Sequence, residues 1–279
     1  MGDEIKVISL DFKEKPKPKI EDLGDGPIDR KPGEIPVSRV AFKDDTPALV
    51  SVRELTKKYG TFTALNNVDL SIRKEKIIGL LGPNGSGKTT LIKILAGLLT
   101  HNSGTVKIDG KDIGEGTKAI VSYLPERPYF NSWMSVKQCL DFFEDFYSDF
   151  SRDIAEEMLE DLQINPKSKL RTLSKGTKEK VQLILVMSRR AKLYLLDEPI
   201  AGVDPAARDY ILDTIISKYN RGASVIISTH LISDVENVLD EYIFIRKGDV
   251  IECGSVKKFK ESSNESLDSH FREVFKYVH

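Results

Sequence analysis

Beyond residue 48 the chain carries short segments whose apolar positions predict strands. Residues 49–55 and 68–72 alternate apolar and polar side chains, as half-buried strands do, and residues 105–110 look like a third strand closed by a turn. Other short segments are continuously apolar, which is typical of central parallel strands covered on both faces. These segments are 77–81, 193–196 and 224–228. The pattern predicts an α/β fold with a buried sheet.

Helical spacing appears in two further stretches. Residues 91–96 are apolar at helical spacing directly after a glycine-rich segment, and residues 136–162 adopt the same period. The apolar positions of the second stretch are Val136, Leu140, Phe143, Phe146, Tyr147, Phe150, Ile154, Met158 and Leu162. Its other faces are rich in Asp and Glu between Asp141 and Asp161. We expect a solvated helix face there, with a docking surface for a basic partner as the alternative.

The two ends of the chain differ from its middle. Residues 1–48 hold six of the twelve prolines together with charges of both signs, so we expect a mostly extended N-terminal extension. Within it, residues 7–10 form one short strand only if something pairs with them, and a tail without a role stays open. Residues 256–279 predict a C-terminal amphipathic helix that packs on its own domain or on a second copy. Its apolar positions are Leu267, Phe271, Val274, Phe275 and Val278.

Composition excludes several classes of protein. The formal net charge is −1, so the basic footprint of a nucleic-acid-binding protein is missing and no nucleic-acid partner is expected. Cys139 and Cys253 lie far apart, which argues against a disulfide framework or a zinc site and favours a reducing cytosol. The N-terminus lacks the apolar segment of a signal peptide, and no apolar run approaches the roughly 18 residues of a membrane helix. We therefore expect a soluble chain whose membrane role, if any, comes through a partner.

Residues 82–90, Gly-Pro-Asn-Gly-Ser-Gly-Lys-Thr-Thr, carry the strongest chemical signal. They fit the pattern G-x-x-x-x-G-K-[ST], whose backbone N–H groups can surround nucleotide phosphates. The apolar strand 77–81 precedes the loop and the helical pattern 91–96 follows it, which is the context that the motif requires. A helix N-terminus there presents partial positive charge and unpaired N–H donors to an anion.

Further motifs follow in a fixed order, and together they resemble the nucleotide-binding subunit of the ATP-binding cassette (ABC) family. After the loop come Leu173-Ser174-Lys175-Gly176-Thr177, Asp197-Glu198-Pro199, Ala201-Gly202-Val203-Asp204 and His230. The resemblance spans about residues 49–254. It implies an α/β P-loop ATPase core with an antiparallel β subdomain and a helical signature subdomain at about residues 127–180, within a nucleotide-binding domain at 49–255.

The resemblance also implies a role for each matching residue. Lys88 reaches the β- and γ-phosphates, Thr89 and Asp197 hold Mg²⁺, and Glu198 positions or polarises the attacking water while His230 contacts the γ-phosphate. Tyr59 stacks on adenine. The implied ATP-binding residues are Tyr59, Gly82, Asn84, Gly85, Ser86, Gly87, Lys88, Thr89, Thr90, Ser174 and Gly176.

Three positions depart from the family pattern. In the segment that is normally Leu-Ser-Gly-Gly-Gln, Lys175 replaces the first glycine and Thr177 replaces the glutamine. Ser174 and Gly176, which the family uses to contact the ATP of the other subunit, are retained. Lys175 either strengthens that contact or points to solvent. Glu126 stands where the family carries a glutamine near Mg²⁺, and its own metal role is left open.

The resemblance implies that two copies, or two related chains, close head to tail around two ATP molecules. We expect the chain to power a membrane transporter with a separate permease, on the inner face of the cell membrane, exporting peptides, drugs or similar cargo. The alternatives are a soluble ABC ATPase that acts on a cytosolic complex and a subunit that binds nucleotide without hydrolysing it. Glu198 and His230 argue against the last of these.

Overall fold

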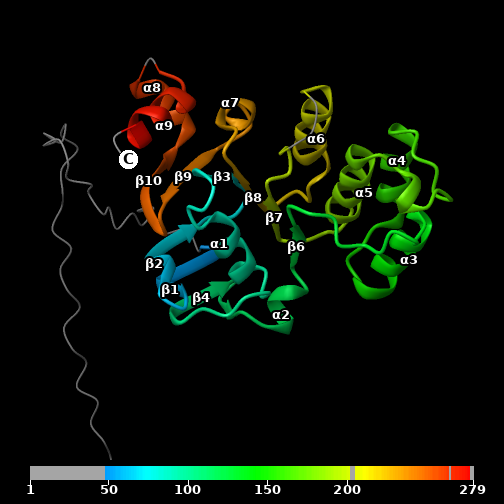
Figure 1. Cartoon of the computed structure of the whole chain (residues 1–279), viewed down its shortest axis with the longest axis horizontal. Helices are drawn as coiled ribbons and strands as arrows, with labels where there is room; N and C mark the ends of the chain where they lie inside the picture. Colours follow the sequence, from blue (N-terminus) through cyan, green and yellow to red (C-terminus); the bar gives the residue numbers. More distant parts are fainter. Residues whose placement is uncertain (1–47, 202–204, 264, 277–279) are drawn as a thin grey trace, which may run out of the picture. The chain divides into compact units, whose positions relative to one another are not determined.

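The computed structural model describes residues 48–201, 205–263 and 265–276, with the side chains of residues 205–207 excepted. The predicted N-terminal extension, including residues 7–10, lies outside the described residues except for Ala48. Two sheets and the helices around them make up the described chain (Figure 1). None of its helices combines the length and the apolar character that crossing a bilayer requires.

The larger sheet has the strand order β10-β9-β3-β8-β7-β6. Strands β9, β3, β8, β7 and β6 are parallel to their neighbours, and β10 is antiparallel to β9. The bounds are β3 Ile77–Leu81, β6 Val121–Leu124, β7 Leu193–Asp197, β8 Ser224–Thr229, β9 Glu241–Arg246 and β10 Asp249–Ser255. The continuously apolar segments 77–81, 193–196 and 224–228 are thus central strands, as predicted.

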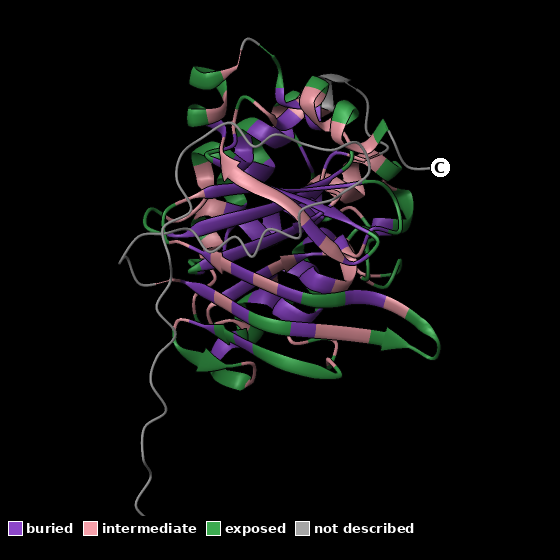
Figure 2. Ribbon diagram, turned by 90° about the vertical axis from the view of Figure 1, so that its left-hand side faces the viewer, coloured by how far each residue is buried: buried purple, intermediate pink, exposed green. Residues whose placement is uncertain are grey.

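The middle positions of β3, β7 and β8 are apolar because both faces of the sheet are covered. Leu80 and Ile226 belong to one apolar cluster, whereas Leu81 and Ile227, their neighbours in sequence, belong to a second cluster. Successive side chains of a strand point to opposite faces, so the two clusters are the two sides of one sheet. Figure 2 shows the resulting band of buried strands through the middle of the domain.

The smaller sheet is antiparallel in the described chain, with the order β2-β1-β4-β5. Its strands and the two helices nearest in sequence are β1 Val50–Tyr59, β2 Phe62–Ile72, β4 Ser103–Ile108, β5 Lys111–Asp112, α1 Lys88–Leu95 and α2 Glu115–Lys118. Leu91, Ile92, Ile94 and Leu95 of α1 share one core with apolar residues of both sheets. The helix that follows the phosphate loop is therefore held between the two sheets.

Helices on the other face share a core with β3, β7, β8 and β9. They are α3 Val136–Phe146, α4 Arg152–Asp161, α5 Lys175–Met187, α6 Pro205–Lys218 and α7 Ile232–Val235, with the short 3₁₀ helix η1 at Leu170–Thr172. Of these, α3, α4 and α5 lie together beyond β6 (Figure 1). The stretch 136–162 is helical, as its spacing predicts, but it is broken at residues 147–151. The break occurs because Phe150 pairs with Arg189 and the Ser151 N–H donates to the Ser188 carbonyl at 2.8 Å.

Arg189 fastens this break to the sheet. Its guanidinium is buried, donates to the carbonyl oxygens of Val121 (2.6 Å) and Ala119 (2.9 Å), and pairs with Asp149 at 2.9 Å. It also lies 3.8 Å from the ring centre of Tyr147. All of these partners are lost together when the guanidinium is removed.

Replacing Arg189 with leucine should lower the free energy of unfolding by about 3–5 kcal/mol, because Asp149 is left as an uncompensated, largely buried charge. Urea unfolding followed by circular dichroism measures this change. The exposed neighbour Arg190 offers a matched control, and Arg190→Leu should change the free energy by less than about 0.5 kcal/mol. Equal effects of the two variants would show that the Arg189 contacts add nothing to stability.

Four carboxylates on the acidic face of α3 and α4 have cationic partners within the described chain. Arg152 bonds to Asp141 (2.8 Å), Glu144 (3.1 Å) and Glu156 (2.7 Å), and Lys218 bonds to Glu157 at 2.7 Å. Since these carboxylates already have cationic partners, the geometry favours the solvated face over a docking surface for a basic partner.

The C-terminal segment forms two helices rather than one, α8 Val256–Ser262 and α9 Leu267–Lys276. The single predicted helix would run through Ser262 and Ser263. Serine side chains can bond to nearby backbone groups and so compete with the backbone hydrogen bonds of a helix. Of the two packing alternatives, the chain adopts the first, because Phe271 and Phe275 pack edge-to-face against Phe244 of β9, with 5.2 and 5.9 Å between ring centres. Val278 lies outside the described residues.

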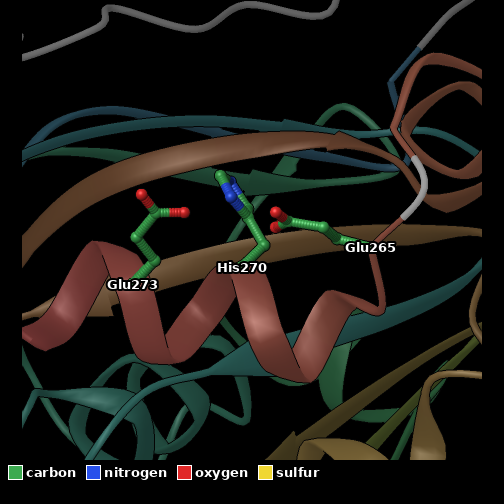
Figure 3. Close-up of side chains that lie close together, drawn as sticks. All are labelled: Glu265, His270 and Glu273. Atoms are coloured by element: carbon green, nitrogen blue, oxygen red, sulfur yellow. The ribbon is translucent and has the colours of Figure 1, made fainter.

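Figure 3 shows His270 of α9 between Glu273 of the same helix and Glu265, which lies just before the helix. The Nε2 atom of His270 already lies 2.9 and 3.1 Å from the two oxygens of Glu252 in β10. The two other carboxylates are exposed. This cluster joins α9 to the edge strand of the larger sheet.

Candidate functional site

The phosphate loop connects β3 to α1 and leaves the N-terminus of α1 open. No side chain among the described residues caps the helix, and its N-cap residue is Gly87. The first backbone N–H groups of a helix have no partner within the helix, so they need one from outside. An uncapped N-terminus bordering a cavity is suited to an anion such as phosphate.

Two glycines of the loop are required by close packing. A side chain at Gly82 would come within 2.3 Å of the Ile245 carbonyl oxygen, and one at Gly87 within 2.7 Å of the Ala64 carbonyl oxygen. Gly87 also has φ +112°, a conformation that residues with a side chain rarely adopt. These two positions therefore hold the loop against β9 and β2.

Lys88, the first residue of α1, folds back over the loop. Its ammonium group donates to the carbonyl oxygens of Gly82 (2.7 Å) and Pro83 (3.2 Å) and lies 3.3 Å from Glu198. The side chain is only 5% exposed. A buried cation is thus held beside the open helix N-terminus.

Asp197 ends β7 directly below the loop. Its Oδ1 accepts hydrogen bonds from the Thr89 hydroxyl (3.1 Å) and the Ser228 hydroxyl (2.7 Å), while the buried Oδ2 has no partner among the described residues. Burial raises the pKa of this carboxyl, and the nearby charges of Glu198 and Glu126 add to that rise. A positive charge close to Oδ2, in addition to that of Lys88 in the same site, would stabilise the ionised form of Asp197.

Glu198, the next residue, links the lysine to the histidine. Its second oxygen lies 3.1 Å from Nδ1 of His230, opposite the oxygen near Lys88. The backbone is left-handed there, with φ +51°, and the N–H donates to Ser228 of the neighbouring strand. Non-glycine residues seldom adopt this conformation, and it is common at functional sites.

These groups border one cavity of about 380 Å³. The lining residues are Tyr59, Phe62, Ala64, Asn84, Gly85, Ser86, Gly87, Lys88, Thr89, Thr90, Glu126, Glu198, Ala201 and His230. The structure thus brings together the predicted loop, Tyr59, Glu126, Glu198 and His230, with Asp197 joined to them through Thr89. Tyr59 is 46% exposed, as a residue that stacks on a base must be.

Ser174 and Gly176 do not line this cavity. They lie at the N-terminus of α5, where the Ser174 hydroxyl accepts from the Thr177 N–H at 3.1 Å. A side chain at Gly176 would meet no atom within 4 Å, so no packing in the described chain requires a glycine there. Lys175 is 76% exposed and points away from the body of the domain, 3.8 Å from Glu179. Gly202, Val203 and Asp204 lie outside the described residues.

Comparison with known proteins identifies the family of this site. A family model described as ABC transporter matches residues 65–201. The uncharacterized ABC transporter ATP-binding protein YxlF of Bacillus subtilis (strain 168) is 31% identical over 224 residues, covering 78% of this chain and 75% of YxlF. The chain belongs to the ABC transporter ATP-binding protein family. It is therefore an ATPase subunit of a transporter.

Two other ABC proteins extend the comparison. The linearmycin resistance ATP-binding protein LnrL of the same organism is 30% identical, with coverage of 74% of this chain and 69% of LnrL. A solved ATP-binding subunit of an ABC transporter superposes with a TM-score of 0.73 and 26% identity, covering 81% of this chain and 99% of that chain. The predicted α/β P-loop fold is confirmed.

The donor set fits the Mg²⁺ and ATP that an ABC subunit uses. Oxygen atoms, carboxylate oxygens above all, are the ligands that Mg²⁺ prefers. Asp197 offers an unpartnered oxygen, Oδ2, and its other oxygen, Oδ1, accepts a hydrogen bond from the Thr89 hydroxyl. The buried Ser86 hydroxyl of the loop likewise has no partner among the described residues. Buried polar atoms normally have partners, so these two indicate a ligand.

Sequence reasoning missed two residues of this ABC site. Phe62 is 59% exposed, pairs with Tyr59 across the β1–β2 turn and lines the cavity. Ser228 holds Asp197 and the backbone of Glu198. A polar residue inside an otherwise apolar buried strand was the available signal for Ser228, whereas Phe62 carried no signal distinct from that of a surface turn.

Gly176→Ala should leave the melting temperature unchanged within about 2 °C, because the added methyl group meets open space. If Gly176 instead approaches a phosphate of another copy, the same substitution should weaken ATP-dependent association by about 10-fold or more. Differential scanning fluorimetry and analytical ultracentrifugation with ATP measure the two effects. Unchanged association would remove Gly176 from the predicted ATP-binding residues.

Proposed function

We propose that this ABC subunit binds Mg²⁺ and ATP in the cavity at the phosphate loop and hydrolyses ATP within a head-to-tail pair of copies. The observation that carries the proposal is the cavity itself. It joins an uncapped helix N-terminus, a buried lysine, and the carboxylate and imidazole of Glu198 and His230. Ser174 and Gly176 do not line this cavity, which is consistent with their serving the ATP of a second copy.

Each side chain has a defined task in this proposal. Bound Mg²⁺ and ATP supply a divalent charge and the phosphoryl group that is transferred. Lys88 turns from Glu198 to the β- and γ-phosphates, and Thr89 and Asp197 hold the metal ion. Glu198, freed from the lysine, accepts a hydrogen bond from the attacking water, and His230 orients that water through the ring nitrogen opposite Nδ1. Tyr59 stacks on the adenine.

A direct assay tests this part of the proposal. The purified chain should release phosphate from ATP only with Mg²⁺ present, and it should form a dimer in ATP when hydrolysis is blocked. Phosphate release without any dimer at saturating ATP would contradict the head-to-tail arrangement.

The permease is expected to dock on an aromatic surface between β6 and the end of α3. We define this surface by Tyr129, Trp133, Phe142 and Phe146, which are 52%, 59%, 47% and 70% exposed. Phe142 and Phe146 stack with 5.6 Å between ring centres. A cluster of exposed aromatic side chains marks an interaction site. The partner that we propose is an amphipathic helix of a separate membrane permease, with the subunit on the cytoplasmic face of the membrane.

The cargo that we propose is a peptide, a drug or a similar compound, moved outward. Support comes from the resemblance to export-type subunits and from LnrL, whose name records resistance to linearmycin. A change in resistance or secretion after deletion of the chain from its host would test the direction.

Affinity purification from host membranes, followed by mass spectrometry, tests the permease. We expect the tagged chain to recover a protein with several membrane spans, and the double variant Phe142→Ser/Phe146→Ser to lose it. Leu98, an exposed apolar residue on another surface (60%), provides the control Leu98→Ser, which should retain the partner. Recovery of a soluble complex instead would favour the alternative of a cytosolic ABC ATPase.

A further inference from the structure

The two charged departures from the family pattern, Glu126 and Lys175, have opposite signs. Glu126 lines the nucleotide cavity, whereas Lys175 lies between Ser174 and Gly176 at the N-terminus of α5. Neither position requires a charge for the fold, because both side chains are exposed. Since neither charge is explained by the fold, we ask whether Glu126 and Lys175 interact with each other.

On the cavity side, negative charge is in excess. Glu126 and Glu198 line the cavity, Asp197 lies below it, and Lys88 is the only lysine or arginine among the described lining residues. Lys88 is already paired with Glu198. No described cation lies within 4.0 Å of Glu126, so its charge meets the incoming phosphates uncompensated. The negative charges of Glu126 and of the phosphates repel each other, which opposes nucleotide binding unless a cation from outside the cavity compensates Glu126.

On the other side, positive charge is in excess. Residues 167–180 contain six basic side chains and one acidic side chain, Glu179. Lys175 lies 3.8 Å from Glu179, a long contact with an exposed ammonium group. The Glu179 side chain is only 18% exposed, but the ammonium group lies in solvent and 3.8 Å is a long separation, so the contact contributes little stability. Lys175 can therefore leave Glu179 for a new partner at little cost.

We propose that Lys175 of one copy pairs with Glu126 of the partner subunit when two copies close around ATP. This inference rests on the proposed function, in which Ser174 and Gly176 meet the phosphates in the partner's cavity. Lys175 is then carried to the cavity that Glu126 lines, and its long flexible side chain can reach across. The pair replaces a glycine and a glutamine with a complementary charge on each side, which makes ATP-dependent closure specific for chains that carry both charges.

Within one chain a hydrogen bond joins the helix of Lys175 to the segment that carries Glu126. The Gln182 side chain, on the same helix as Lys175, donates to the Pro125 carbonyl at 3.2 Å, directly before Glu126. Because two-fold symmetry repeats each contact, a dimer contains two such pairs. In the proposed dimer, each cavity therefore contacts α5 of the other copy through that copy's Lys175. It is joined to α5 of its own chain through the hydrogen bond of Gln182 to Pro125.

Charge reversal tests the pairing between copies. In a Glu198→Gln background, the variants Lys175→Glu and Glu126→Lys each place like charges together twice per dimer. Each should weaken ATP-dependent dimerisation by about 10-fold or more. A mixture of the two variants contains one reversed pair and one native pair per mixed dimer, so mixed dimers should form within about threefold of the parent. Energy transfer between chains that carry different fluorescent labels measures the mixed dimers, and sedimentation in Mg²⁺ and ATP measures dimerisation of each variant alone.

Three further measurements make the result decisive. Lys167→Glu reverses an exposed charge of the same basic segment and should weaken dimerisation much less than Lys175→Glu. A fluorescent ATP analogue measures nucleotide binding by each variant as a monomer. If Glu126→Lys prevents nucleotide binding, the neutral variants Lys175→Gly and Glu126→Gln replace the reversals. Lys175→Gly should then weaken dimerisation when Glu126 is present but change it little in the Glu126→Gln background, where no pair is left to lose.

The outcomes separate this inference from the proposed function. Rescue in the mixture, or an effect of Lys175→Gly that disappears in the Glu126→Gln background, supports the pair. A parent that dimerises while the mixture is not rescued, or while the two neutral changes act independently, overturns the pair and leaves the ATP-bridged dimer standing. A parent that stays monomeric at saturating ATP overturns the dimer and the pair together.

Discussion

Glu198→Gln should reduce steady-state ATP hydrolysis by about 10²-fold or more, because the amide can no longer accept a proton or polarise water as the carboxylate does. ATP binding should persist, since Glu198 is not among the groups proposed to hold phosphate. Glutamine has nearly the same shape, so the contacts with Lys88 and His230 can be retained as neutral hydrogen bonds. The variant should accumulate as a closed dimer with bound ATP.

Phosphate release and sedimentation in Mg²⁺ and ATP measure the two effects of Glu198→Gln separately. Glu115 of α2 is an exposed glutamate outside the cavity, and Glu115→Gln serves as the control that should hydrolyse at the parent rate. Hydrolysis by Glu198→Gln at the parent rate would show that another group activates the water. Loss of ATP binding instead would mean that Glu198 holds the ligand.

The sequence predicted the elements that alternate or run apolar without interruption. Segments such as 77–81 and 224–228 were recognisable because a strand buried on both faces is mostly apolar, and the structure confirms them as strands. The family followed from motifs whose spacing is fixed by the loop and the strand ends. Roles within the site remain predictions, although the geometry brings most of the named residues to one cavity.

Other features depended on contacts between distant segments. The break after α3 is held by Arg189, about forty residues later, and nothing local to residues 147–151 specifies that partner. Phe146 has the spacing of a core residue but is 70% exposed, since the helix ends as its face turns outward. Within one copy the Lys175 side chain is 76% exposed because α5 begins at the surface, and its contact with a second copy stays a prediction. Tertiary contacts decide such cases, whereas periodicity does not.

Removing the Lys88 ammonium group should lower the affinity for ATP by about 10²-fold or more, because two charge-assisted hydrogen bonds to phosphate are each worth about 1.5–3 kcal/mol. Lys88→Ala tests this but also empties a buried position and leaves the carbonyl oxygens of Gly82 and Pro83 without their donor. Lys88→Met keeps most of the side-chain volume and removes only the charge and the donors. Both variants should lose ATP binding, while the methionine variant should melt closer to the parent.

Titration with a fluorescent ATP analogue and thermal unfolding without nucleotide separate the two contributions of Lys88. Lys93 lies on the same helix with an exposed side chain, so Lys93→Met should bind ATP like the parent. If Lys88→Met binds ATP within about twofold of the parent, the lysine does not hold phosphate. Its contacts with the loop carbonyls would then be its whole contribution, and the uncapped N-terminus of α1 would have to bind the phosphates alone. We expect the loss of affinity instead, because backbone donors by themselves leave the carboxylates of the cavity without a cationic side chain beside the phosphates.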